Sequence, residues 1–179
     1  MNDRNIILST GATIPFNVWD TGLRRRDLGM ITPHVSTAEV SVRDANGEKQ
    51  ETGFTISEVI LTVFEAMRSK WRGPLEITSG YRTPEKQALL ASNPNAATYS
   101  PHQEGMALDI GATSPEMVDL FVDILRSLRH NWPIRIGWKK YRENGFNFVH
   151  VDVCPFYFGK NGPWAGRKCP DQWREPSEW

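Results

Sequence analysis

Three observations predict an α+β domain. Two segments, 56–71 and 114–128, repeat apolar residues at the spacing of one helix face. Several short segments rich in β-branched or aromatic residues are typical of strands. The last two of these, 134–138 and 146–153, flank a turn-like segment at 142–145 and predict an antiparallel hairpin. The length of 179 residues fits one domain with its own core.

Composition excludes several classes of protein. Lys and Arg together number 21, as do Asp and Glu, so the formal net charge is zero. A neutral chain has no electrostatic basis for binding nucleic acid or an anionic membrane. No apolar run reaches the roughly 20 residues that span a bilayer. We therefore expect a globular monomer whose partner is neither nucleic acid nor a membrane.

The N-terminus and the cysteines bear on cellular location. The first ten residues lack a basic segment followed by a long apolar stretch, so they do not resemble a secretory signal. We expect synthesis in the cytoplasm, and a substrate outside the inner membrane would require release by another component. Cys154 and Cys169 allow either one bridge or two buried thiols.

The first third of the chain is expected to be mostly irregular. Residues 1–52 carry scattered glycine and proline and show little periodicity. Within them, residues 38–43 alternate apolar and polar side chains and predict a strand that enters a turn at 44–47.

The clearest helix covers 56–71. Thr55 or Ser57 can cap its start, and Gly73–Pro74 should end it before a short strand at 75–78. Its apolar face consists of Ile56, Val59, Ile60, Val63, Phe64, Met67 and Trp71.

The second half continues the mixed pattern. Pro84 is placed to open a helix that Asn93-Pro94-Asn95 ends, and a strand is expected at 106–110. A helix over 114–128 follows, and from 154 to 179 tryptophan, proline and glycine dominate without periodicity. The core face of that helix is expected to be Met117, Leu120, Phe121, Ile124, Leu125 and Leu128.

Three residues could together hold a metal ion. His102 and Asp109 lie seven positions apart, and His150 lies in a later strand. Three protein ligands with an open fourth position are typical of catalytic zinc, which activates water and polarises a carbonyl. Strand alternation places Asp109 opposite its apolar neighbours, and puts His150 on one face with Phe148 and Asp152. The alternative is a polar pair, His150 and Asp152, at a strand edge.

Three blocks in the sequence resemble one enzyme family. They are SGYRTP at 79–84, SPHQEGMALDI at 100–110 and FVHVDV at 148–153. In this order they resemble the D-alanyl-D-alanine carboxypeptidase family of zinc peptidases, over residues 53–153. That family includes murein endopeptidases and phage endolysins, and its fold is shared with the Hedgehog signalling domain.

The resemblance implies a fold and an activity. The fold would be a small antiparallel sheet with helices packed on one side. A peptidase domain at 53–153 would carry an N-terminal extension, 1–52, packed on it, and a Trp-rich C-terminal tail, 154–179. The activity would be zinc-dependent hydrolysis of peptide bonds in the peptidoglycan stem, for phage or prophage lysis, with delivery by a holin or a phage particle. The alternative is a zinc-bearing binding or structural module that has lost catalysis.

The resemblance also implies roles for individual residues. His102, Asp109 and His150 match the zinc ligands. Arg82 matches the arginine that binds substrate and stabilises charge on the scissile carbonyl. The remaining predicted site residues are Ser100 and Tyr81, expected near the substrate, and Asp152, expected to fix a ligand or Arg82.

One departure from the family concerns the general base. Many members carry His or Glu two or three residues before the last ligand, where this chain has Phe148 and Asn147. Neither can accept a proton from the attacking water. Glu104, Glu143 and Asp152 are the nearest candidates, and Glu143 could equally be a solvated loop charge.

Overall fold

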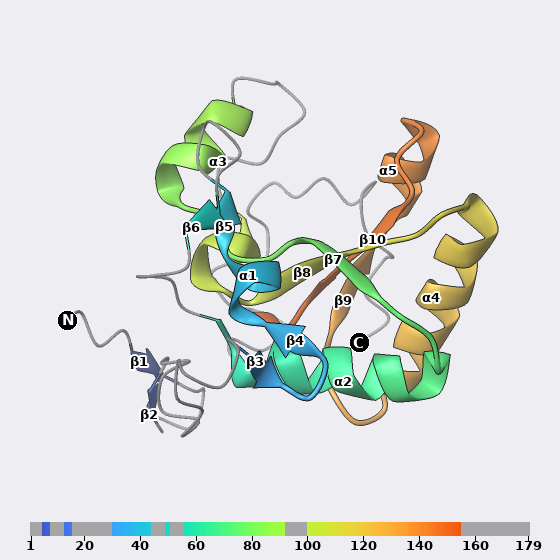
Figure 1. The fold of residues 1–179 in the computed structure, drawn as a ribbon, viewed down its shortest axis with the longest axis horizontal. Helices are drawn as coiled ribbons and strands as arrows, with labels where there is room; N and C mark the ends of the chain where they lie inside the picture. Colours follow the sequence, from blue (N-terminus) through green and yellow to red (C-terminus); the bar gives the residue numbers. More distant parts are fainter. Residues whose placement is uncertain are drawn as a thin grey trace.

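A computed structural model describes residues 5–7, 13–15, 30–43, 49–50, 56–91 and 100–154. Its centre is a four-stranded antiparallel sheet in the order β7–β8–β10–β9 (Figure 1). The α+β class and the small antiparallel sheet expected from the sequence are confirmed. The strands are β7 (Glu76–Ser79), β8 (Ala107–Gly111), β9 (Arg135–Gly137) and β10 (Phe148–Asp152).

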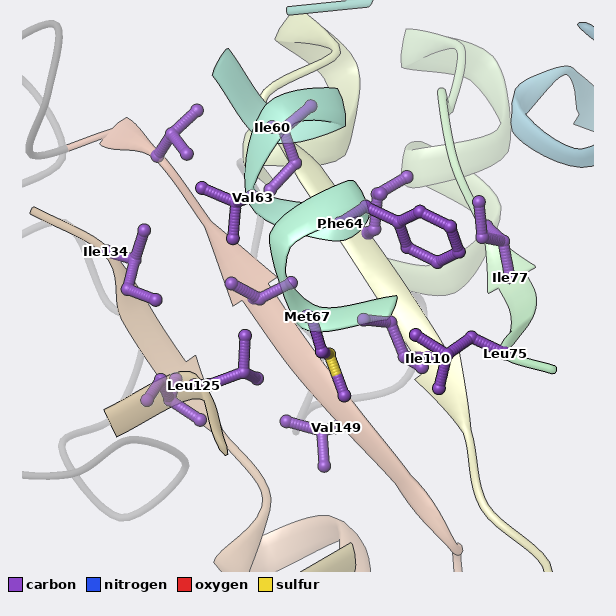
Figure 2. Close-up of a cluster of buried hydrophobic side chains, with 14 of the residues drawn as sticks. Ile60, Val63, Phe64, Met67, Leu75, Ile77, Ile110, Leu125, Ile134 and Val149 are labelled. Atoms are coloured by element: carbon purple, nitrogen blue, oxygen red, sulfur yellow. The ribbon is translucent and has the colours of Figure 1, made fainter. Parts of the chain in front are cut away.

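Helices α2 (Glu58–Trp71) and α4 (Pro115–Leu128) pack on the apolar face of this sheet. Alternation in β8 and β10 sends Leu108, Ile110, Val149 and Val151 to that face, and each is fully buried. Side chains of α2 lie over these strands in the close-up of the core (Figure 2). The opposite face of the same strands carries the polar residues described below.

Helix α2 (Glu58–Trp71) follows from local sequence signals. The Ser57 hydroxyl caps its start by accepting hydrogen bonds from the backbone N–H groups of Val59 and Ile60. Arg72 ends the helix in the left-handed conformation, just before Gly73. The predicted face is buried over most of its length, with Val59 and Trp71 partly covered at its margins.

Helix α4 (Pro115–Leu128) begins as predicted, and Phe121, Leu125 and Leu128 of the predicted face are buried, but the covered stripe is shifted toward Val118 and Val122. Ser114 caps it by accepting from the Met117 N–H at 3.3 Å. Leu120, expected in the core, is 53% exposed, whereas Val118 and Val122 are buried. The apolar surface of this helix is wider than one stripe, so packing against the sheet and α2 decides which edge is covered.

The β9–β10 pairing confirms the predicted antiparallel hairpin, but the prediction of a simple turn between the two strands is wrong. A short helix, α5 (Lys139–Glu143), precedes the turn that the sequence placed at 142–145. Gly145, at φ +80°, closes this helix with its N–H on the Arg142 carbonyl oxygen. The strand therefore starts at Phe148 rather than at residue 146.

The N-terminal region contributes short elements and part of the core. The expected strand over 38–43 is wrong at its start, because α1 (Thr37–Val40) forms there. A capping box explains the helix, with the Ser36 N–H and hydroxyl both on the Glu39 carboxylate. The turn expected at 44–47 lies outside the described residues. Among the described residues of this region, Ile31, Val35 and Val40 contribute apolar side chains to the core, and Ser41 is buried as well.

The remaining elements are short. Strand pairs join β1 (Asn5–Ile7) to β2 (Thr13–Pro15), β3 (Met30–Thr32) to β4 (Val35–Ser36), and β5 (Val42–Arg43) to β6 (Lys49–Gln50). Helix α3 (Pro84–Ala91) starts at the expected proline, and η2 (Pro101–Glu104) is one 3₁₀ turn. Within the described part of the chain, no helix is long and apolar enough to cross a membrane.

Two predictions concern residues near or beyond the end of the described chain. Cys154 is buried beside Met106, with 3.8 Å between the two sulfur atoms, while Cys169 lies outside the described residues. The Trp-rich tail beyond residue 154 and the helix break at 93–95 also lie outside them.

Candidate metal centre

Three side chains converge on the polar face of the sheet. The β8–β10 register sets Asp109 directly opposite His150, and η2 brings His102 against both. Asp109 Oδ1 lies 2.9 Å from His150 Nδ1 and 3.2 Å from His102 Nε2, and the two nitrogens are 3.2 Å apart. All three residues are buried. The structure therefore brings together the three residues that the sequence predicted as ligands.

The turn before β8 positions His102. Ser100 and Gln103 form a capping box on η2, in which the Ser100 N–H donates to Gln103 Oε1 at 2.8 Å. Gly105, at φ +64°, then reverses the chain into β8. Ser100 is itself buried, with its hydroxyl directed at the His102 N–H at 3.4 Å. Its geometry suits holding this turn, and its contact with substrate stays a prediction.

Each imidazole is oriented by a partner on its other ring nitrogen. His102 Nδ1 lies 2.7 Å from the Gly80 carbonyl oxygen, and His150 Nε2 lies 3.3 Å from Asp152 Oδ2. When these nitrogens carry the protons, His102 Nε2 and His150 Nδ1 present lone pairs toward Asp109. Metal-binding histidines are oriented by carbonyl and carboxylate partners in this way.

The Gly80 carbonyl is held in turn by the N-terminal region. A Cβ added at Gly80 would lie 2.4 Å from the Val40 carbonyl oxygen, so only glycine fits there. The next residue, Tyr81, donates its N–H to that same oxygen at 2.8 Å. The end of α1 therefore packs directly against the loop that orients His102.

Burial and mutual contact shift the pKa values of the three groups. Burial lowers the pKa of His102, which favours its neutral ring. Burial alone would raise the pKa of Asp109, but His102 and His150 hold it well below its usual range. Burial alone would lower the pKa of His150, yet its hydrogen bonds to Asp109 and Asp152 raise it. The additional proton of a charged His150 ring would lie on Nδ1, the nitrogen that faces Asp109, where a metal ion would bind. Protons and metal should therefore compete for His150.

The donor set fits a divalent metal ion. Two imidazole nitrogens and one carboxylate oxygen lie within 4.8 Å of one another, and all three residues are buried. Three such ligands leave a fourth tetrahedral position for water or substrate. The hydrogen bonds on the outer ring nitrogens are of the kind that orients metal-binding histidines.

Arg82 lies beside this group. Its Nη2 is 3.8 Å from Asp109 Oδ2, and its backbone N–H donates to the His102 carbonyl oxygen. The guanidinium is held by Gln87 Oε1 at 2.9 Å and by Ser79 Oγ at 3.2 Å. Gln87, which is buried on α3, was not predicted as a site residue; its position five residues after Arg82 was the available signal.

Other predicted site residues lie at different depths. Asp152 is fully buried behind His150 and binds Arg135, with Nε to Oδ1 at 2.8 Å. Glu143 is exposed at the end of α5, and Glu104 is half-buried at the end of η2. Tyr81 is half-buried against the core. Their catalytic and substrate-binding roles stay predictions.

Phe148, at one of the two positions where many family members carry the general base, lies among other aromatic side chains. Phe148 packs on Tyr141, with ring centroids 4.2 Å apart, and the Phe146 ring lies 6.4 Å from that of Phe148.

Arg135 is a second site residue that the sequence did not predict. It stands directly opposite Asp152 in the β9–β10 register, a pairing that becomes visible only once the hairpin register is known.

The chain was compared with curated proteins, solved structures and models of protein families. No curated protein matches the chain. Among solved structures, the L-Ala D-Glu endopeptidase ChiX of Serratia marcescens is similar with a TM-score of 0.46 and 13% identity, over 56% of this chain and 82% of that one. The family model for Peptidase M15 matches residues 33–152, which include the whole His102–Asp109–His150 group and begin in the region before α2. The chain therefore belongs to the peptidase M15 family.

Proposed function

We propose that this protein is a zinc-dependent peptidase that hydrolyses peptide bonds in the peptide stem of peptidoglycan. The observation that carries the proposal is the convergence of three buried ligand atoms on one point, with an arginine beside them. Membership of a peptidase family supports the reaction class. A role in phage or prophage lysis, after release to the cell wall, is part of the proposal.

In this proposal His102, Asp109 and His150 hold the metal through Nε2, Oδ1 and Nδ1. A bound zinc ion would activate water and polarise the scissile carbonyl. The chain contributes the orientation of the ligands, since Gly80 and Asp152 hold the outer nitrogens of the two rings. Burial of all three residues excludes bulk water from around the ligands.

Arg82 would bind the substrate next to the metal. Its guanidinium stays charged at any physiological pH and donates from a planar fork, which suits a carboxylate or a developing oxyanion. Gln87 and Ser79 fix that fork from behind. Tyr81 and Ser100 flank Arg82 and His102 in the sequence and are the further substrate-side candidates.

Three carboxylates are candidates for the general base that accepts a proton from the attacking water. Asp152 is fully buried and receives hydrogen bonds from Arg135 and the Cys154 N–H, so its geometry favours holding His150 over taking a proton from water. Glu104 and Glu143 are the other candidates, and both have some exposure to solvent.

One observation favours a second candidate function. Phe148 and Asn147 stand where many family members carry a base, and neither can accept a proton. A zinc-bearing binding or structural module without catalysis would explain that pair. It would keep the metal centre and the fold unchanged.

Mass spectrometry of muropeptides tests the two candidates together. Purified cell wall is incubated with the zinc-loaded protein, with the protein plus chelator, and with a His150→Ala variant. The proposed function predicts new stem-peptide fragments only in the first sample, and their masses identify the bond that is cut. No fragments at full zinc occupancy would favour the non-catalytic module.

A further inference from the structure

We infer that Arg135 is a positioning residue for the metal centre: through Asp152 it holds the His150 ring in the orientation that presents Nδ1 to the metal. This inference rests on the proposed metal site and deepens it. Nothing in the sequence pattern had marked Arg135, which lies on β9, outside the three family-like blocks.

The contacts form a continuous chain from Arg135 to the metal ligands. Arg135 Nε lies 2.8 Å from Asp152 Oδ1 and 3.0 Å from Oδ2. Asp152 Oδ2 lies 3.3 Å from His150 Nε2, and His150 Nδ1 lies 2.9 Å from Asp109 Oδ1. Two side chains, those of Asp152 and His150, thus connect Arg135 to the point where the ligand atoms meet.

Strand register builds this arrangement into the sheet. Asp152 pairs with Arg135 and His150 pairs with Gly137 across β10 and β9. Residues two apart on a strand share a face, so Asp152 and His150 both lie on the polar face, as does Arg135 opposite. Gly137 places no side chain opposite the His150 ring.

The environment makes this carboxylate depend on its partners. The Asp152 side chain is 0% exposed and that of Arg135 is 11% exposed, so water can do little to solvate either charge. A buried carboxylate without a charged partner is strongly unfavourable. Arg135 meets both oxygens, and the Cys154 N–H adds a bond to Oδ1 at 3.1 Å. Together they fix the carboxylate plane, and the fixed Oδ2 sets the rotation of the His150 ring.

Loss of Arg135 should therefore disturb the ring before it disturbs the fold. In Arg135→Gln the Asp152 carboxylate loses its charged partner and turns toward any other donor, so the restraint on His150 is weakened. Arg135→Lys keeps the charge but offers a point donor in place of a planar group, and should be intermediate. Ligand-orienting partners of this kind typically contribute about 10–100-fold to metal affinity.

The first measurement is zinc affinity by competition with a chromophoric chelator. We expect Arg135→Gln to bind zinc about 10–100-fold more weakly than the parent and Arg135→Lys to lie between them. Arg126→Gln is the matched control, because the half-exposed Arg126 side chain pairs with Asp123 on the outer surface of α4 and lies over the Trp138 ring, outside the His102–Asp109–His150 group. Affinity of Arg135→Gln within about twofold of the parent, well below the expected 10–100-fold loss, would overturn the inference.

The second measurement needs no metal. Nitrogen-15 NMR of the histidine rings reports which ring nitrogen carries the proton in the metal-free protein. We expect the parent to show a hydrogen-bonded Nε2–H of His150 on Asp152, whether or not Nδ1 also carries a proton, and this signature to be partly lost in Arg135→Gln but retained in Arg126→Gln. An unchanged signature in Arg135→Gln would also overturn the inference.

The two measurements separate failure of the inference from failure of the proposed function. A parent that binds no zinc, yet shows an Arg135-dependent His150 signature, would refute the metal centre and leave the positioning role intact. If Arg135→Gln does not fold, as judged by circular dichroism, the decision passes to Arg135→Lys. Parental zinc affinity and a parental metal-free ring signature in Arg135→Lys would then overturn the inference.

Discussion

The two faces of the central sheet are built from the same strands but by different physical rules. In β8, Leu108 and Ile110 face the helices while Asp109 between them faces the metal centre; in β10, Val149 and Val151 alternate with His150 in the same way. Both faces are buried. The apolar face needs only close packing, whereas the polar face needs a partner for every buried donor and acceptor.

This difference teaches where sequence change should be tolerated. Apolar packing is roughly proportional to buried area and loses stability in increments. A polar network fails as a unit, because one missing partner leaves another group buried and unsatisfied. Substitutions on the polar face should therefore weaken metal binding more than they lower stability, and substitutions on the apolar face should lower stability while the zinc bound per folded molecule stays unchanged.

The largest expected effect is removal of two ligands. The parent should bind about one zinc per chain, and His102→Ala with His150→Ala should bind none and show no peptidase activity. Metal analysis of protein purified without chelator is the measurement. An intact metal load in the double variant would contradict the assigned ligands, and chelator treatment of the parent should reproduce the loss of activity.

The next effect tests which carboxylate accepts the proton. We expect Glu104→Gln or Glu143→Gln to lower turnover by about 10²–10⁴, the usual contribution of a general base. Asp152→Asn should instead lower zinc affinity, because the amide changes the group that orients His150. Turnover on cell wall is compared at equal zinc content. Parental rates in both glutamine variants would place the base elsewhere.

Arg82→Lys tests a residue beside the polar face that should affect turnover but neither the fold nor metal binding. It should keep the fold and the zinc but lose about 10²–10³ in turnover, because lysine lacks the planar fork that addresses an oxyanion. Steady-state kinetics with the zinc content measured alongside gives the answer. Near-normal turnover would mean that Arg82 acts only through its contacts with Gln87 and Ser79.

Ile110→Ala is the counterpart on the apolar face, next to Asp109 in the chain. Ile110 is fully buried in the cluster of Figure 2, so its truncation should cost about 2–5 kcal/mol of unfolding free energy. Zinc bound per folded molecule should be unchanged. Chemical denaturation and metal analysis of the same preparation check both halves, and loss of zinc at parental stability would refute the separation of the faces.

The smallest expected effect concerns a contact outside the candidate metal centre. Glu65 on α2 accepts from the His34 N–H at 3.0 Å, from His34 Nδ1 and from the Thr32 hydroxyl. Burial alone would raise the pKa of Glu65, but these hydrogen bonds lower it overall. A lowered folded-state pKa stabilises the protein above the unfolded value and is lost as the pH falls through the folded value.

Glu65→Gln should therefore destabilise the protein by about 1 kcal/mol at pH 7. The difference from the parent should shrink below about pH 4, where the unfolded carboxyl is protonated. Urea denaturation at both pH values is the measurement. A difference independent of pH would mean that the carboxylate charge contributes nothing to this contact.

Much of this protein could be predicted from local sequence. Helical spacing and serine caps determined α2 and the start of α4, because these signals act within one or two turns of the chain. The motif around His102 and Asp109, with the later His150, identified the three residues that converge. Its residue types and order carry the chemistry, whatever the details of packing.

Tertiary structure decided what depends on distant partners. Which stripe of α4 is buried, with Leu120 outside and Val122 inside, depends on the sheet and on α2 rather than on the helix itself. The pairing of Arg135 with Asp152 depends on the register of two strands whose connection, α5, had been predicted as a simple turn. Of the two orienting partners, Asp152 beside His150 was expected from the sequence, whereas the Gly80 carbonyl beside His102 is brought there only by the fold. Sequence determines which groups are present and how each segment folds locally, whereas non-local contacts determine which atom of each group faces the site.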